Sequence, residues 1–152
     1  MNKNTAACLA ETLVHIRRVQ EILSIFVHEL LDRGNNHDSS KLSDPELSIF
    51  AENTFKLRDL KYGSEEYNAS LAAIKPAIEH HYARNRHHPE HHKNGIDDMT
   101  LSDILEMFAD WKAASERQND GNILKSIQHN SERFNISPQL VKIFENTARE
   151  MF

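Results

Sequence analysis

Residues 5–33 read TAACLAETLVHIRRVQEILSIFVHELLDR, and the polar segment GNNHDSSKLS follows at residues 34–43. Leucine and isoleucine recur in the first segment at the three- and four-residue steps of an amphipathic helix. Asn4 or Thr5 can cap the start of this helix, and Gly34 can end it. The stretch therefore predicts one long helix followed by an irregular polar connector.

One histidine of this helix lies on an apolar stripe. His15 precedes Val19, Ile22 and Phe26 at steps of four, three and four residues, which place the four side chains on one side of a helix. We therefore expect the His15 imidazole to face the interior. A core histidine with a hydrogen-bond partner is one interpretation, and a metal ligand is the other.

The rest of the chain also has a helical pattern. Ser43-Asp-Pro-Glu46 and Ser64 are typical helix starts, Pro76 is expected to kink or divide a helix, and Thr100 or Ser102 can cap another. The predicted helices cover residues 5–33, 43–60, 64–89 with an interruption at Pro76, 100–118, 122–134 and 138–151. Breaks are expected at 62–63, 93–99 and 119–121. With only 4 Gly and 4 Pro, the sequence predicts an all-α fold of about six helices.

Length and composition favour a single globular domain. The chain has 152 residues, of which 39% are hydrophobic and 27% are charged. These values are typical of a folded protein with a core of its own. No repeat or low-complexity linker divides the sequence, so we predict one helical domain over residues 1–152.

The charge balance limits the classes of partner. Eighteen basic and 23 acidic residues give a net charge of −5, which disfavours binding to a nucleic-acid duplex but leaves a small phosphorylated ligand open. No apolar run predicts a membrane span. Cys8 is the only cysteine, so no internal disulfide can form, and we expect a cytoplasmic protein.

Histidine is over-represented in one part of the chain. Six of the 10 histidines lie between His80 and His92. Metal binding is one explanation, and a histidine-rich helix end at the surface is another. Neighbouring residues of a helix point about 100° apart, so we do not expect the four imidazoles of His87, His88, His91 and His92 all to meet at one point.

The sharpest local signal is His37-Asp38-Ser-Ser-Lys41. It follows the helix that carries His15 and precedes the one that carries Asp110. Neutral imidazoles and ionised carboxylates are ligands for divalent metals such as manganese, iron, cobalt, zinc or magnesium. Asp110 shares a helix face with two other acidic residues, Asp103 and Glu106, so a solvated acidic stripe is the competing interpretation.

These segments resemble the HD superfamily of metal-dependent phosphohydrolases. His15, the HDxxK element at residues 37–41, the pair His80-His81 and the Ala109-Asp110 segment occur in the order that the family shows. The sequence around His81 and from residue 106 to 126 is also similar to a group of small uncharacterised phage and bacterial proteins. That resemblance implies the HD-type helical fold but no particular reaction.

The resemblance implies a site and a reaction. His15, His37, Asp38 and Asp110 match the ligands of a single divalent metal ion, and two-metal members usually supply a further histidine where this chain has none. The reaction implied is hydrolysis of a nucleotide or another small phosphoester by a metal-activated water. Asp38, Lys41, His81 and His88 are the candidate catalytic residues, His81 and His88 as further ligands or proton donors. The candidate phosphate contacts are Lys41, Arg84, Arg86 and Arg117.

Two other functions remain open. Some proteins with the HD fold hold two irons and oxidise a carbon substrate, which requires both His81 and His88 to bind metal. The chain could also be a binding or regulatory module that uses a metal only for stability. Exposed apolar residues near the C-terminus, Phe144, Met151 and Phe152, would allow a homodimer.

Overall fold

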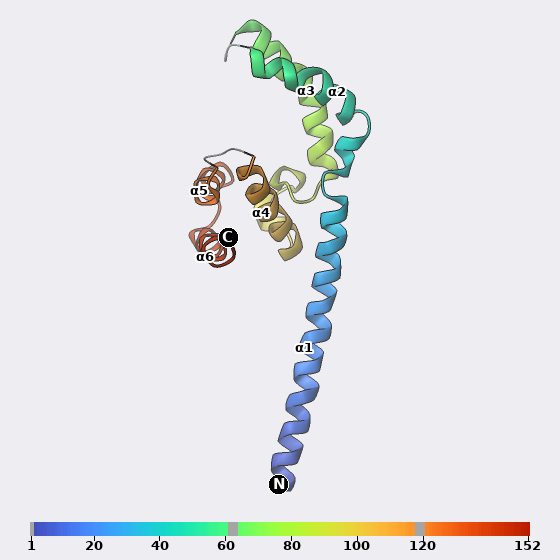
Figure 1. Cartoon of the computed structure of the whole chain (residues 1–152), viewed down its shortest axis with the longest axis vertical. Coiled ribbons are helices and arrows are strands. Elements are labelled where there is room, and N and C mark those ends of the chain that lie inside the picture. The colour runs from blue at the N-terminus through green and yellow to red at the C-terminus, as the bar shows by residue number, and fades with distance from the viewer. Residues whose placement is uncertain (1, 61–63, 118–120) are drawn as a thin grey trace. The chain divides into compact units, whose positions relative to one another are not determined.

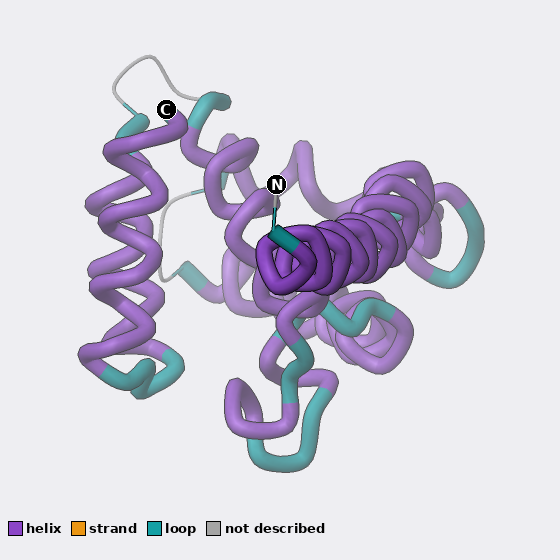
Figure 2. The backbone as a smooth tube through the Cα atoms, turned by 90° about the horizontal axis from the view of Figure 1, so that it is seen from below, coloured by secondary structure: helices purple, strands orange, loops and turns teal. Residues whose placement is uncertain are grey.

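The computed structural model describes residues 2–60, 64–117 and 121–152, and within 54–59 it describes the backbone alone. All regular elements in these ranges are helices, so the predicted all-α fold is confirmed (Figure 2). The chain divides into two compact units, Met1–Asn36 and His37–Phe152. The single domain expected over residues 1–152 stays a prediction. No helix in the described part of the chain is long and apolar enough to cross a membrane.

The first unit is the helix α1, Lys3–Asn36, which confirms the helix predicted at residues 5–33. Gly34 does not end it, since the helix continues for two more residues. None of the described residues of α1 is buried, and Leu13 is 64% exposed. His15 is exposed as well, so the expectation that its ring faces an interior is not met on this helix.

Two helices of the second unit lie side by side (Figure 1). These are α2, Glu46–Asp59, and α3, Glu65–Arg84. Ser64 caps α3 as predicted, because its hydroxyl accepts the backbone N–H of Tyr67. The expected division at Pro76 is wrong, since α3 runs through this residue without interruption. The predicted break at residues 62–63 lies outside the described residues.

The end of α3 differs from the prediction and shapes the site. The helix ends at Arg84, five residues before Pro89. Asn85 and His88 both have extended backbone conformations, and His88 directly precedes the proline, whose ring disfavours a helical conformation at that position. Two short 3-10 helices follow, η2 at Pro89–His91 and η3 at Gly95–Asp98, of which only η3 lies inside the segment 93–99 that was expected to be a loop.

Three further helices, α4 (Leu101–Ser115), α5 (Ile123–Arg133) and α6 (Pro138–Met151), enclose the apolar core (Figure 1). Thr100 forms a capping box with Asp103 at the start of α4, as the sequence indicated. The buried core residues come from all three helices and the loop before α6: Met107, Phe108, Trp111, Ile127, Ile136, Phe144 and Ala148. The turn expected at 119–121 lies mostly outside the described residues.

The core includes Phe144, one of the three residues on which the predicted homodimer depends. Phe144 is only 4% exposed and stacks on Phe108, with ring centroids 5.2 Å apart. It was predicted to be exposed and available to a partner, and that prediction is wrong. Met151 and Phe152 are exposed, at 68% and 64%.

Candidate metal centre

Four side chains of the second unit bring their ligand atoms together. Asp38, His81, His87 and His88 each offer one atom, and these atoms all lie within 4.8 Å of one another. His81 is in the last turn of α3, and the other two histidines follow in the turn between Asn85 and Pro89. Asp38 stands in a left-handed conformation, φ 55°, just before the short helix η1, Ser39–Leu42. The group therefore depends on the irregular backbone at both segments.

The Asp38 carboxylate lies at the middle of this group. Its Oδ1 atom is 3.3 Å from Nε2 of His81 and 3.5 Å from Nε2 of His87. Nε2 of His88 lies 2.8 Å from Nε2 of His81. Imidazole nitrogens and a carboxylate oxygen thus point into one small volume, which is the donor set that zinc, manganese, iron and cobalt accept.

Two atoms of the group are buried without a hydrogen-bond partner. They are Oδ1 of Asp38 and Nε2 of His87. An unsatisfied buried polar group costs about 1–3 kcal/mol, so such atoms need an explanation. A cation held between them would satisfy both lone pairs at once. The residues present therefore fit a divalent metal ion, and Asp38 with His81, His87 and His88 would hold it.

A carboxylate behind the group orients two of the imidazoles. Oε1 of Glu106, on α4, accepts a hydrogen bond from Nδ1 of His37 at 3.0 Å and lies 3.1 Å from Nδ1 of His87. A histidine that donates its Nδ1–H keeps a lone pair on Nε2, the form needed for metal binding. The contact with Glu106 thus favours a lone pair on Nε2 of His87.

A second carboxylate does the same from the other side. Glu46, the first residue of α2, is fully buried and accepts hydrogen bonds from Nδ1 of His80 at 2.7 Å and from Nδ1 of His81 at 2.8 Å. His81 therefore presents the lone pair of Nε2 to Asp38.

Three residues of the predicted single-metal set lie together. Nε2 of His37 is 3.7 Å from Oδ2 of Asp38 and 3.6 Å from Oδ1 of Asp110. Asp38 thus faces His37 with one oxygen and both His81 and His87 with the other. His15 belongs to the other compact unit and to neither group of ligand atoms found among the described residues, so its role as a ligand stays a prediction.

The electrostatics favour the metal-binding forms of two ligands. Burial opposes the charge of Asp38, but the neighbouring His81 ring and the hydrogen bond from Lys41 outweigh it and hold the pKa of Asp38 well below its ordinary value. Burial, followed by the neighbouring His87 and His81, lowers the pKa of His88 to about 3. Asp38 is therefore ionised and His88 neutral at neutral pH, and a divalent cation binds these forms.

The acidic residues around His37 have the opposite effect on this ring. Asp110 and then Glu106 raise the pKa of His37 to about 10, against a smaller effect of burial. Burial opposes the charge of Asp110, but its hydrogen bond with His37 lowers the pKa of that carboxyl. The interpretation of Asp103, Glu106 and Asp110 as a solvated acidic stripe is wrong, because Asp103 is fully buried and Glu106 is mostly buried.

The predicted phosphate contacts lie in different surroundings. Lys41 donates to Oδ2 of Asp38 at 2.6 Å. Arg84 lines a separate polar cavity of about 350 Å³ beside Asn85 and three serines of residues 39–43. Arg117 is exposed beyond the end of α4.

Arg86 is not a free phosphate contact. It donates from Nε and Nη2 to the two oxygens of the buried Asp103, at 3.2 and 3.0 Å. This fork-like pair ties the segment after α3 to the start of α4. Arg86 therefore has a structural role that the sequence did not indicate.

This role gives a prediction for stability. Arg86→Ala should lower the free energy of unfolding by about 2 kcal/mol, because the buried Asp103 carboxylate loses its charged partner while the half-exposed arginine regains water. The neighbouring variant Arg84→Ala, on an exposed side chain, should change stability by less than about 0.5 kcal/mol. Urea unfolding measures both. Equal effects of the two substitutions would show that the pair with Asp103 is not important.

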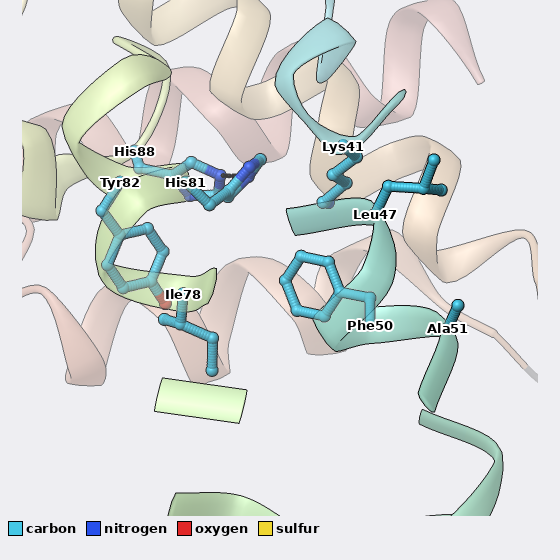
Figure 3. Close-up of a pocket in the computed structure, with 8 residues that line it drawn as sticks. All are labelled: Lys41, Leu47, Phe50, Ala51, Ile78, His81, Tyr82 and His88. Carbon is cyan, nitrogen blue, oxygen red and sulfur yellow. Dashed lines mark hydrogen bonds between the residues drawn. The ribbon is translucent and has the colours of Figure 1, made fainter. Parts of the chain in front are cut away.

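A pocket of about 560 Å³ opens beside the metal group (Figure 3). His81 and His88 form one part of its wall, and Lys41 faces them (Figure 3). The remaining described residues of the wall are apolar or aromatic: Leu47, Phe50, Ala51, Ile78 and Tyr82. A ligand in this pocket would therefore meet the candidate metal ligands at its polar end.

Sequence reasoning missed three residues of this centre as site residues. His87 was treated only as a member of the histidine cluster, Glu46 only as part of a helix start, and Glu106 only as part of the acidic stripe. A signal was available for Glu106, which lies four residues before Asp110, one helical turn away on the same face. No local pattern identified Glu46, since its partners lie 34 and 35 residues away.

Comparison with curated proteins and with solved structures gave no match. A family model matches residues 4–150, which include nearly all of both compact units and every residue of the candidate centre. The chain therefore belongs to DUF5662, a family of unknown function.

Proposed function

We propose that the protein is a metal-dependent hydrolase of a small phosphoester. The observation that carries the proposal is the pair of partnerless buried atoms, Oδ1 of Asp38 and Nε2 of His87, beside a pocket whose polar end holds Lys41. A bound divalent metal would supply a water of lowered pKa and would neutralise charge on a phosphoryl oxygen. The order of the motifs, which resembles the HD superfamily, points to the same class of reaction.

The side chains around the group have distinct tasks in this proposal. Lys41 has three N–H donors and uses one of them on Asp38, so the others can hold a phosphoryl oxygen at the pocket's polar end. Asp110 is ionised and adjoins His37, and it can accept a proton from the attacking water. Glu46 and Glu106 hold the rings of His81 and His87 in their orientations.

The proposal is tested by metal analysis combined with a hydrolysis screen. The purified protein should contain or take up a stoichiometric divalent metal, and the metal-loaded protein should release inorganic phosphate from at least one phosphomonoester or nucleotide. Chelation should stop the release, and added metal should restore it. Metal uptake without turnover on any phosphoester would overturn the proposal and favour the non-catalytic module.

Lys41 gives a prediction that separates substrate binding from metal binding. Lys41→Ala should raise KM for a phosphoester about tenfold, because a charge-assisted contact to the phosphate is lost. The metal content should stay close to that of the unchanged protein, since the lysine is not among the candidate ligands. Steady-state kinetics and element analysis measure the two quantities. An unchanged KM would remove Lys41 from the substrate site.

A di-iron oxygenase is a second candidate, and one observation favours it. That function requires His81 and His88 to bind metal together, and their Nε2 atoms lie 2.8 Å apart. Lys41 at the same pocket favours an anionic substrate and therefore the hydrolase. Two irons per chain with substrate-dependent oxygen consumption, and no phosphate release, would decide for the oxygenase.

A further inference from the structure

The pocket beside the metal group is a groove between two helices. Leu47, Phe50 and Ala51 lie three and four residues apart, on one face of α2. Ile78 and Tyr82 are one turn apart on α3, on either side of His81 in the sequence. The groove therefore starts at the candidate metal ligands and continues between apolar side chains.

The two ends of this groove differ in chemistry. Lys41, His81 and His88 supply all of its charged or titratable nitrogen groups, and they lie together at one end (Figure 3). Phe50 and Tyr82 both direct their rings into the pocket, from α2 and α3 respectively (Figure 3). Among the described residues that line the groove there is no carboxylate and no amide. Away from that end, the Tyr82 hydroxyl is the one polar side-chain group among the described lining residues, and Arg133 donates to it at 3.4 Å.

We infer that the phosphoester carries a ring-bearing, apolar organic group, which Phe50 and Tyr82 hold while its phosphate lies at Lys41 and the metal group. The inference rests on the proposed function and names its substrate class. A pocket of about 560 Å³ is within the usual range for a ligand of one or two rings. Aromatic side chains hold such a ring by its face, so the pocket selects for a ring and not for particular polar substituents.

The test measures binding of ligands that cannot be hydrolysed. Benzylphosphonate and methylphosphonate carry the same anionic group and differ in the ring. Titration calorimetry of the manganese-loaded full chain should give benzylphosphonate at least about a tenfold lower Kd, because burial of the ring adds apolar contact. Equal affinities for the two phosphonates would overturn the inference.

A substitution identifies the residues that hold the ring. Phe50→Ala should weaken benzylphosphonate about tenfold and leave methylphosphonate unchanged. Leu42→Ala is the matched control, since Leu42 lies on η1 beside Lys41 but is 78% exposed and is not part of the pocket wall. If Phe50→Ala does not fold, Leu47→Ala tests the same wall at a half-exposed position, with an expected loss of about threefold. No change for the variant that folds would contradict the inference.

Binding and turnover can fail separately in this design. Suppose that benzylphosphonate binds selectively but that no phosphoester releases phosphate. This result would support a ring-binding pocket and overturn the proposal of a hydrolase. Phosphate release together with equal binding of both phosphonates would support the proposal of a hydrolase and overturn the inference of a ring-binding pocket.

Discussion

Asp38→Ala should abolish stoichiometric metal binding and, with it, all phosphoester hydrolysis. Its Oδ1 atom faces His81 and His87, and Oδ2 faces His37 and Lys41, so one substitution removes the group that all of them share. Replacing only an outer partner of a metal ligand costs about 10–100-fold in affinity. We therefore expect loss of this central ligand to weaken binding by more than about a hundredfold.

The measurement is titration with Mn²⁺ or Zn²⁺, together with element analysis of the purified variant. Asp97→Asn is the matched control, because Asp97 is an exposed carboxylate on η3 and belongs to neither candidate ligand group. Its metal affinity should equal that of the unchanged protein. An Asp38→Ala protein that keeps its metal would remove the basis for the hydrolase and the oxygenase together.

The same titration decides the role of His15. The sequence indicated this residue as a ligand from its apolar stripe and from the order of the family's motifs. The structure places it on α1, in a different compact unit from the group around Asp38. His15→Ala should lower the affinity if α1 supplies a ligand, and it should leave the affinity unchanged if residues 37–152 hold the metal alone.

The helices could be predicted because their signals are local. Ser64 and Thr100 cap helices where the sequence placed them, since a hydroxyl before an apolar-periodic segment satisfies N–H groups within three residues. The passage of α3 through Pro76 could not be predicted in this way. A proline normally interrupts a helix. The helix α3, which packs against α2, nevertheless continues through Pro76.

The site was predicted less completely because it depends on where one helix ends. His81 and His88 were expected on one face of a continuous helix, seven residues apart. The helix ends at Arg84, and the turn that follows brings both His87 and His88 to Asp38, which adjacent residues of a helix could not do. His37 lies beside both Asp38 and Asp110, which the order of the motifs had grouped together, but Asp110 belongs to neither group of candidate ligand atoms, and their role as one ligand set stays a prediction.

Glu46→Ala should produce the second large effect, on stability and metal affinity together. The substitution leaves the Nδ1–H groups of His80 and His81 without their acceptor, and His81 is itself buried. A lost buried acceptor of two hydrogen bonds should lower the free energy of unfolding by about 2–4 kcal/mol. Because the His81 ring also loses its fixed tautomer, metal affinity should fall about 10–100-fold.

Two further variants separate orientation of the ring from loss of packing. Glu46→Gln keeps the volume and one acceptor oxygen, but its amide NH₂ faces the second N–H donor, so it can satisfy only one of the two histidines. It should therefore recover most of the stability and only part of the metal affinity. Glu52→Ala, at an exposed position of the same helix, should change neither quantity measurably. Ser40 and Asn85 also contact the Nδ1 atom of His81. If Glu46→Gln bound metal as tightly as the unchanged protein, these two residues would set the orientation of His81. The buried Glu46 carboxylate would then be needed for packing alone.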